Sequence, residues 1–165
     1  MFTSVAIIGR PNVGKSSLFN KLTKSRDAIV SDFPGLTKDR NYGFFDIDDD
    51  KILIIDTGGI VNESDNLKEA ISNQAWSAVE ESSFIILMLD SSENLTKDDL
   101  DILHKLRKLN KDYVIVLNKI DKKTDSLIKE DLQKEGIHSA IEISAEHSKN
   151  LSSLKSCIKE RATNI

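Results

Sequence analysis

The sequence predicts an α/β fold, in which a six-stranded, mostly parallel sheet is covered by helices on both faces. First, short apolar runs alternate along the chain with segments that have the length and pattern of helices. Second, the runs Phe84–Leu89 and Val114–Leu117 are apolar without interruption, which is typical of strands buried on both faces of a parallel sheet. Ligands bind such sheets at the carboxyl ends of the strands, so motifs that directly follow strands are the candidate functional residues.

The elements alternate in a regular order. Strands are expected at Ser4–Ile8, Tyr42–Ile47, Ile52–Asp56, Phe84–Asp90, Val114–Asn118 and Ala140–Ile143. The polar turn Asp48–Lys51 predicts a hairpin between the second and third strands, and with it one antiparallel edge strand. The other connections predict helices at Lys15–Thr23, Leu67–Glu81, Thr96–Leu109, Ser126–Glu135 and Leu151–Ala162. Thr96 and Asp99 have the spacing of a helix cap and its partner.

Size and composition indicate a single globular domain over residues 1–165, with 39% hydrophobic and 30% charged residues. A net charge of −4 argues against strong nucleic-acid binding by this domain itself, because a phosphate backbone requires a basic surface. The longest apolar run has six residues, far short of the ~20 that span a bilayer, so no membrane partner is expected. The single cysteine, Cys157, excludes an intramolecular disulfide and fits a reducing cytoplasm.

A glycine-rich segment, residues 9–16 (GRPNVGKS), follows the first expected strand and opens the first expected helix. It matches the phosphate-loop pattern G-x-x-x-x-G-K-[ST] in the strand–loop–helix setting that this pattern requires. Loop amides and the helix dipole attract phosphate oxygens. We expect Lys15 to reach the β- and γ-phosphates, Ser16 to bind Mg²⁺ and Ser17 to lie near the α-phosphate. The candidate phosphate-binding residues are Gly9, Arg10, Pro11, Asn12, Val13, Gly14, Lys15, Ser16 and Ser17.

A second motif, Asp56-Thr57-Gly58-Gly59, ends the third expected strand. Its aspartate can hold Mg²⁺, usually through a water in this class of site. The backbone N–H of Gly59 can approach a γ-phosphate because no side chain blocks it. Thr37 lies in the long aperiodic stretch 27–40, where it could add a Mg²⁺ ligand and a second N–H while the γ-phosphate is present.

A third motif, Asn118-Lys119-Ile120-Asp121, ends the fifth expected strand. The carboxylate of Asp121 can accept two N–H bonds from the edge of guanine, and adenine offers no matching pair of donors. The stem of Lys119 can lie over the base while Asn118 braces the loop. Ser144-Ala145-Glu146 follows the last strand at the same edge of the sheet, where the Ala145 amide could donate to guanine O6.

With these motifs in place, the sequence resembles the translation-factor-like P-loop GTPases, and most closely the first GTPase domain of the Der (EngA) family. The resemblance is nearly residue for residue over residues 9–43, and DTGGI follows at 56–60. Era and MnmE share the first loop, but PGLTKDR combined with the second glycine of DTGG is typical of the first Der domain. The Era family is the second choice within this class.

The resemblance implies a Ras-like fold, GTP hydrolysis with Mg²⁺ and a role in maturation of the large ribosomal subunit. Members of the family carry two tandem GTPase domains and a KH-like domain, so this chain is expected to be a fragment of a longer protein. One departure is the loop after Ala145. The family pattern SAEHGRG has glycines that this sequence replaces, since it continues Glu146-His147-Ser148-Lys149-Asn150.

The sequence departs from the usual GTPase pattern at the residue that orients the attacking water. Ras-like switches place a glutamine directly after Asp-x-x-Gly, and this chain has Ile60 there. Arg10 and Arg40 are candidates for an arginine finger by position only. Related GTPases with an asparagine at the position of Asn12 are stimulated by potassium. We therefore expect K⁺ held by Asn12 to add positive charge in the transition state, so that Asn12, Lys15, Thr37 and Gly59 are the candidate catalytic residues.

Two other functions fit the phosphate loop by itself. One is a binding module that distinguishes GTP from GDP with negligible turnover, which the isoleucine at position 60 favours. The other is an ATP-using phosphotransferase, against which the Asn118–Asp121 motif argues. Phosphate release and a competition between GDP and ADP distinguish these alternatives.

Overall fold

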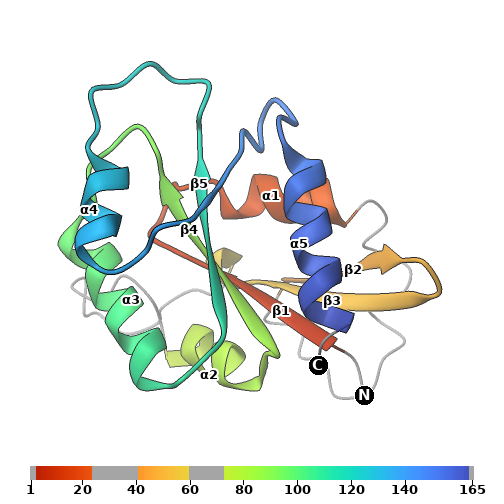
Figure 1. Ribbon diagram of the computed structural model, residues 1–165. Helices are drawn as coiled ribbons and strands as arrows, with labels where there is room; N and C mark the ends of the chain where they lie inside the picture. The colour runs from red at the N-terminus through yellow and green to blue at the C-terminus, as the bar shows by residue number, and fades with distance from the viewer. Residues whose placement is uncertain (1–2, 24–40, 60–72, 164–165) are drawn as a thin grey trace.

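The computed structural model describes residues 3–23, 41–59 and 73–163 of the 165-residue chain. Its sheet has six strands in the order β2-β3-β1-β4-β5-β6, and Figure 1 shows them running through the middle of the molecule. The strands are β1 (Thr3–Ile8), β2 (Asn41–Ile47), β3 (Asp50–Asp56), β4 (Phe84–Asp90), β5 (Tyr113–Asn118) and β6 (Ile141–Glu142). Only β2 pairs in antiparallel fashion, at one edge, which confirms the predicted fold class.

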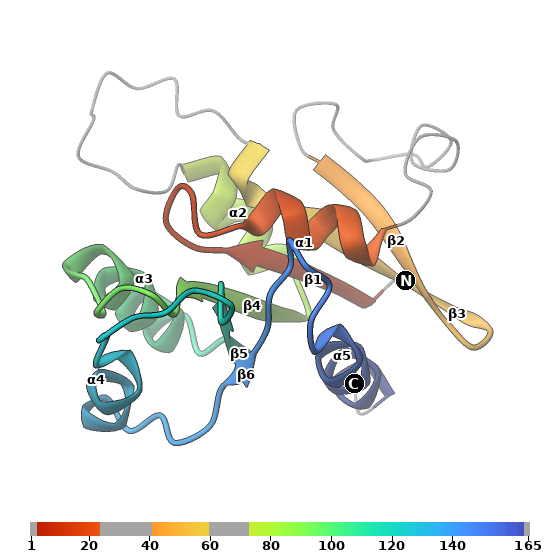
Figure 2. The ribbon, with the colours of Figure 1, turned by 90° about the horizontal axis from the view of Figure 1, so that it is seen from above.

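The helices form two layers, one on each face of the sheet (Figure 1). They are α1 (Lys15–Leu22), α2 (Asn73–Glu81), α3 (Lys97–Lys108), α4 (Ile128–Lys134) and α5 (Leu151–Thr163), and a short 3-10 helix, η2 (Thr57–Gly59), follows β3. One hydrophobic core joins the sheet to α1 and α5, and a second joins its other face to α2, α3 and α4. Figure 2 shows the same elements from above, with α1 next to β1.

Alternation along the strands supplies both cores. In β1, Val5 and Ile7 face the first core while Ala6 and Ile8 face the second, and all four are fully buried. In β4 the same alternation runs through seven buried residues. The strands are apolar on both faces because helices cover both, which is why they read as unbroken apolar runs in the sequence.

The hairpin between β2 and β3 is tighter than the sequence suggested. The expected turn covered residues 48–51, but Ile47 pairs with Asp50 and Asp46 pairs with Lys51, which leaves a two-residue turn at Asp48–Asp49. Asp48 has a φ of 51°. Aspartate tolerates this left-handed conformation better than most residues, so the pairing can continue up to a short turn of the kind that hairpins prefer.

Two expected boundaries were wrong by two residues: β3 begins at Asp50 rather than Ile52, and the fourth helix also begins elsewhere. The fourth helix begins at Ile128 rather than Ser126, because the Ser126 hydroxyl accepts a bond from the Ile128 N–H (3.1 Å) and so starts the helix instead of continuing it. The last strand is two residues long, since only Ile141 and Glu142 pair with β5. The first six residues of the expected helix Leu67–Glu81 lie outside the described residues.

Parallel pairing brings the predicted motifs to one edge of the sheet. Ile8 lies opposite Leu87 in the pairing of β1 with β4, and Asp56 lies opposite Ile7 in the pairing of β3 with β1. Asp90 lies opposite Asn118 in the pairing of β4 with β5. The loops after β1, β3, β4 and β5 therefore leave the sheet side by side. Among the described residues, no helix is long and apolar enough to cross a membrane.

Candidate functional site

The loop between β1 and α1 turns where its two glycines permit it. Gly14 has a φ of 105°, and a Cβ at this position would lie 2.1 Å from the side-chain nitrogen Nδ2 of Asn118. At Gly9 a Cβ would lie 2.6 Å from the backbone oxygen of Met88. Neither position has room for a side chain, so both glycines are required by contacts with β4 and β5, and Gly14 is required by its left-handed φ as well.

Lys15 is held inside this loop. Its side chain is 8% exposed, and its ammonium donates to the backbone oxygens of Gly9 (2.7 Å) and Arg10 (2.6 Å). Burial lowers the pKa of Lys15 to about 8, with the nearby charge of Asp56 opposing this effect and that of Arg10 adding to it. The loop thus fixes the position of an ammonium group at the start of α1, where backbone amides also favour anions.

Ser16 and Asp56, the two predicted Mg²⁺ ligands within the described residues, lie next to each other. The Ser16 hydroxyl donates to Asp56 Oδ2 at 3.0 Å, and Asp56 Oδ1 accepts the N–H of Gly58 at 2.9 Å. Asp56 is 1% exposed, and Thr57 behind it donates to the Ile7 backbone oxygen at 2.7 Å. A hydroxyl and a carboxylate in this arrangement are oxygen ligands of the type that Mg²⁺ prefers.

The loop after β5 is bonded to the phosphate loop. Asn118 Nδ2 donates to the Val13 oxygen (2.8 Å), and its Oδ1 accepts the Ala145 N–H (2.9 Å). Lys119 Nζ donates to the Asn12 oxygen (2.7 Å) and pairs with Asp90 Oδ2 (3.1 Å). Three segments that are far apart in the sequence therefore form one unit. The Ala145 amide is occupied by Asn118 here, and its contact with guanine stays a prediction.

Asp121 lies at the outer end of this unit. His147 Nε2 is 3.3 Å from Asp121 Oδ2. A hydrogen bond from Ser144 is the main cause that lowers the pKa of Asp121, and the charges of His147 and Lys149 lower it further. Since the carboxylate is ionised at neutral pH, it is an acceptor only, as the recognition of two N–H donors requires.

The remaining predicted residues fall into three groups. Val13 is fully buried, whereas Pro11, Asn12, Ser17, Ile120 and Glu146 are exposed near the same end of the sheet. The side chain of Asn12 has no hydrogen-bond partner among residues 3–23, 41–59 and 73–163, and its φ is 69°. Thr37, Arg40 and Ile60 lie outside the described residues. The whole stretch 27–40, which contains Thr37 and Arg40, lies outside them as well. Gly59 is described only as the end of η2.

The sequence did not point to three acidic residues at this end of the sheet. Asp90 pairs with Lys119, and Asp99 and Glu93 both bind the guanidinium of Arg10. Only Asp99 had a recognisable signal, its position in the cap of α3. The spacing of Thr96 and Asp99 does not predict that the Asp99 carboxylate also contacts the phosphate loop, because the fold brings Asp99 and Arg10 together.

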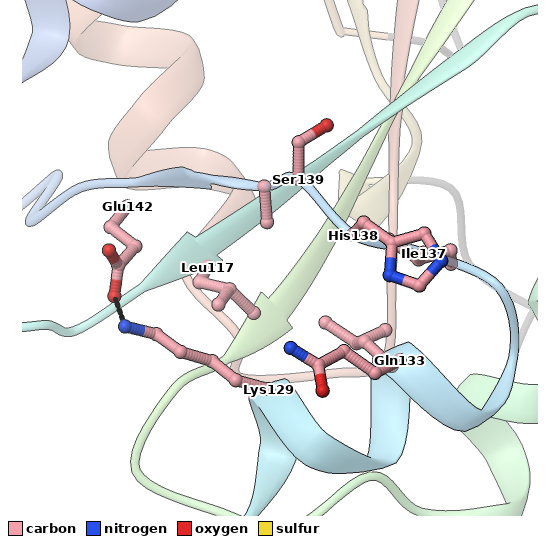
Figure 3. A pocket seen from close by; sticks show the side chains of 9 residues that line it. Leu117, Lys129, Gln133, Ile137, His138, Ser139 and Glu142 are labelled. Atoms are coloured by element: carbon pink, nitrogen blue, oxygen red, sulfur yellow. Dashed lines mark ion pairs between the residues drawn. The ribbon is translucent and has the colours of Figure 1, made fainter.

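The structure also has a hollow away from this site. It measures about 250 Å³ and lies between α4 and the β6 segment. Figure 3 shows Lys129 and Glu142 at one side of it, joined by an ion pair of 2.6 Å. None of the predicted motif residues lines this hollow, and its walls show no convergent set of phosphate-binding groups. The candidate functional site is the end of the sheet that carries the phosphate loop and the loops after β3 and β5.

The fold and this site define the class of the molecule as a P-loop nucleotide-binding protein, and comparisons with known proteins narrow the class. The family model described as 50S ribosome-binding GTPase matches residues 4–119. GTPase Der of Legionella pneumophila (strain Corby) is 42% identical over 163 residues, covering 99% of this chain and 35% of that protein. GTPase Der of Saccharophagus degradans is 38% identical over 160 residues, covering 97% and 34%. The chain therefore belongs to the 50S ribosome-binding GTPase family.

Solved structures agree with this assignment. A variant of Aquifex aeolicus Era bound to GDP and tetrafluoroaluminate superposes with a TM-score of 0.77 at 32% identity, covering 98% of this chain and 57% of that one. The G domain of the Thermotoga maritima iron transporter FeoB gives 0.69 at 29%, covering 98% and 99%. The chain is thus a GTPase domain similar to Der and Era, and it spans about a third of the length of the Der proteins that it matches.

Proposed function

We propose that this domain binds GTP with Mg²⁺, hydrolyses it with stimulation by K⁺, and acts as the first GTPase domain of a Der-like protein in assembly of the large ribosomal subunit. The observation that supports this most directly is the bonded unit of Asn118, Lys119 and the phosphate loop. It supports the proposal because it bonds the Asn118–Asp121 motif, the proposed base site, to the loop at residues 9–16, the proposed phosphate site. A guanosine nucleotide needs binding groups for its base at one end and for its phosphates at the other, at a set distance from each other.

At the phosphate end, this chain supplies cations and amides. Lys15 would contact the β- and γ-phosphates from its position against the Gly9 and Arg10 oxygens. Ser16 and Asp56 would hold Mg²⁺, with Thr37 as a further ligand, and the bound ion would neutralise charge between these two phosphates. Gly59 would offer its N–H to the γ-phosphate. These groups stabilise the charge that develops on the transferred phosphoryl group.

At the base end, Asp121 would accept two N–H bonds from guanine while Lys119 lies along the ring. Adenine would leave the Asp121 carboxylate without donors, and losses of that kind give discrimination of about 10⁴ or more. Ala145 and its neighbours Ser144 and Glu146 would border the base from the next loop.

Ile60 cannot hydrogen-bond to water, so the usual water-positioning side chain is replaced in this chain. The exposed Asn12 amide, which lacks a partner among the described residues, is available as an oxygen donor to a cation. K⁺ held there would add positive charge beside the phosphates. Arg10 is already paired with Asp99 and Glu93, which favours a cation over this arginine as the source of that charge.

Calorimetric titration in MgCl₂ tests the nucleotide choice. We expect GDP to bind and ADP not to bind at concentrations about a hundred times higher. Asp121→Asn should lose preference for GDP and gain affinity for the diphosphate of xanthine, whose ring carbonyl replaces the amino group and can accept a bond from the new amide. Equal binding of ADP and GDP by the wild-type domain would contradict the proposal.

Turnover measured in KCl and in NaCl at equal ionic strength tests the cation. The wild-type domain should release phosphate faster in KCl, and Asn12→Ala should remove the difference while it keeps GDP affinity. Equal rates in both salts would exclude the role of K⁺. Turnover indistinguishable from buffer in both salts would favour a nucleotide-sensing module instead of an enzyme.

The larger role rests on the longer relatives. We propose a cytoplasmic protein in which a second GTPase domain and a KH-like domain follow this one and in which the nucleotide state controls contact with the large ribosomal subunit. Sedimentation of the full-length protein with ribosomal subunits, in GTP analogue and in GDP, tests this. An Era-like protein would instead lack the second GTPase domain, which the downstream sequence decides.

A further inference from the structure

Asp99 has two functions in the structure, and helix capping explains only one of them. As the third residue of α3 it completes a capping box, in which its Oδ2 accepts the Thr96 N–H (3.0 Å) and its own N–H donates to the Thr96 hydroxyl (3.1 Å). Its other oxygen, Oδ1, accepts the Nε–H of Arg10 at 2.8 Å. Asp99 is only 1% exposed. Without Arg10, a buried carboxylate oxygen would be left without its cation.

Arg10 connects this carboxylate to the phosphate-binding lysine. Its side chain is 18% exposed and is held by two charged bonds, since Nη2 also donates to Glu93 Oε2 at 2.8 Å. Its backbone oxygen accepts the Lys15 ammonium at 2.6 Å. A side chain anchored in this way restricts the rotation of its own peptide unit, so the anchor limits where the carbonyl that binds Lys15 can lie.

The anchor itself is firm. Helix α3 packs on the second core through Ile102, Leu103 and Leu106, all buried, and the Thr96 backbone N–H holds the Asp99 carboxylate at its first turn. Thus the chain of contacts runs from a packed helix through Asp99 and Arg10 to the ammonium of Lys15.

We propose that Asp99, acting through Arg10, is a positioning residue for the Lys15 ammonium in nucleotide binding. This inference rests on the proposed phosphate role of Lys15. It predicts that Asp99 contributes to the affinity for nucleoside diphosphates only as long as Lys15 is present. Residues that position a ligating group typically change affinity by about 10- to 100-fold when they are removed.

The test is a double-mutant cycle on GDP affinity, measured by calorimetry with Mg²⁺ in the wild-type domain, Asp99→Asn, Lys15→Ala and the double variant. We expect Asp99→Asn to weaken GDP binding about tenfold and to have less than a twofold effect in the Lys15→Ala background. Non-additivity of this kind distinguishes positioning from a general loss of stability, which would weaken binding equally in both backgrounds.

Thr96→Ala is the matched control, because it removes the capping hydroxyl of the same helix turn and leaves the bond between Asp99 and Arg10. It should lower the stability of the fold and leave GDP affinity within twofold of the wild type. If Asp99→Asn does not fold, Arg10→Met takes its place in the cycle, since it keeps much of the apolar stem and loses both charged bonds.

Three results would overturn the inference: unchanged GDP affinity in Asp99→Asn, an equal loss in both Lys15 backgrounds, or an equal loss in Thr96→Ala. Unchanged affinity in Lys15→Ala would overturn the proposed phosphate role of the lysine as well. If Lys15→Ala weakens GDP binding and Asp99→Asn does not, only the positioning role of Asp99 is refuted, and the phosphate role of Lys15 stands.

Discussion

At the scale of single residues, Gly14 shows how a motif glycine is fixed by what lies next to it. Its φ of 105° is in the left-handed region, and the space of a side chain is taken by Asn118. Gly136 also has a left-handed φ, 80°, but no atom lies within 4 Å of the position of its Cβ. A substitution at Gly136 therefore tests backbone strain by itself, whereas a substitution at Gly14 tests strain together with a steric clash.

Gly14→Ala should destabilise the fold by distinctly more than Gly136→Ala. For Gly136→Ala we expect roughly 1 kcal/mol, the strain of a left-handed residue. At Gly14 the same strain is joined by displacement of Asn118, which breaks its bonds to Val13 and Ala145, so we expect a total of about 2–4 kcal/mol. Denaturant unfolding of both variants checks the difference, and GDP binding should be lost only in Gly14→Ala. Equal costs would show that the Asn118 contact is unimportant.

Asp90 gives a prediction for pH. Its burial raises the pKa, but hydrogen bonds from Ser92 and the ion pair with Lys119 outweigh this, so the pKa lies below its ordinary value. A carboxyl whose pKa is lower in the folded state stabilises the fold above its unfolded pKa, about 3.9, and loses this effect as the pH falls through the folded pKa.

Asp90→Asn should therefore lower the free energy of unfolding at pH 7 by about 1–3 kcal/mol, and the difference from the wild type should shrink as the pH falls below about 4. Denaturant unfolding at a series of pH values measures it. Asp125→Asn, at an exposed loop position, is the control and should stay within about 0.5 kcal/mol of the wild type at each pH. A difference that is constant down to pH 3 would contradict this assignment.

The meeting of the three motifs at one end of the sheet could be predicted because each follows an expected strand, while the ligand role of each motif residue stays a prediction. The partners of Arg10 and Lys119 could not be predicted. Asp99 and Asp90 are 89 and 29 residues away from them, and no local pattern marks which of the chain's many acids the fold will bring to a given cation. The residue spacing within a motif indicates what its loop can bind. The side chains that hold the loop in place are brought there by the tertiary structure, so the spacing does not indicate them.

At the scale of elements, the loop from Ser144 to Asn150 keeps a conformation that suits glycine without containing one. Ser148 and Asn150 have φ values of 54° and 59°, and they occupy the two positions where the family pattern has glycine. The loop is closed by paired bonds between the backbones of Ser144 and Lys149 (3.1 and 2.9 Å). Ser148 and Asn150 therefore hold the loop in a left-handed conformation that glycine would adopt without strain.

Ser148→Gly should stabilise the domain by about 0.5–1 kcal/mol, because relief of roughly 1–2 kcal/mol of strain exceeds the added entropy of the unfolded chain. Asn150→Gly should instead destabilise it by about 1 kcal/mol, since the Asn150 side chain bonds to the Glu142 oxygen (2.7 Å) and accepts from Ser153 (2.7 Å). Chemical unfolding of the two variants checks the opposite signs. Destabilisation by both would show that Ser148 is unstrained.

Elements with a strong periodic signal were predicted to within two residues, as β1, β4, α3 and α5 show. The errors fall where side chains compete with backbone pairing. Ser126 lies just before α4 and starts it through its hydroxyl, which accepts the Ile128 N–H, instead of being part of the helix. The strand β6 has too few pairing residues for an apolar run to define it. Local hydrogen bonds of this sort cannot be read from periodicity.

At the scale of the whole molecule, one sheet is shared by two cores, and the site lies where its strands end. A ligand that spans the loops after β1, β3 and β5 would stabilise segments attached to both cores. GDP with Mg²⁺ at about a hundred times its dissociation constant should add roughly 2.7 kcal/mol to the stability, which corresponds to a rise in Tm of about 5–10 °C for a domain of this size.

Thermal unfolding with and without GDP measures this shift, with ADP at the same concentration as the control. Lys15→Ala should show a smaller rise at equal GDP concentration. A rise that is the same with ADP would mean that the base end of the site does not select guanine. The absence of any rise would contradict nucleotide binding by the native domain.

The bonds from Lys119 to the Asn12 oxygen and from Asn118 to the Val13 oxygen fasten the loop after β5 directly to the phosphate loop. The two loops share backbone acceptors, so a displacement of one is transmitted to the other. A substitution at Asn118 or Lys119 should for this reason loosen the phosphate loop as well as the loop that carries it.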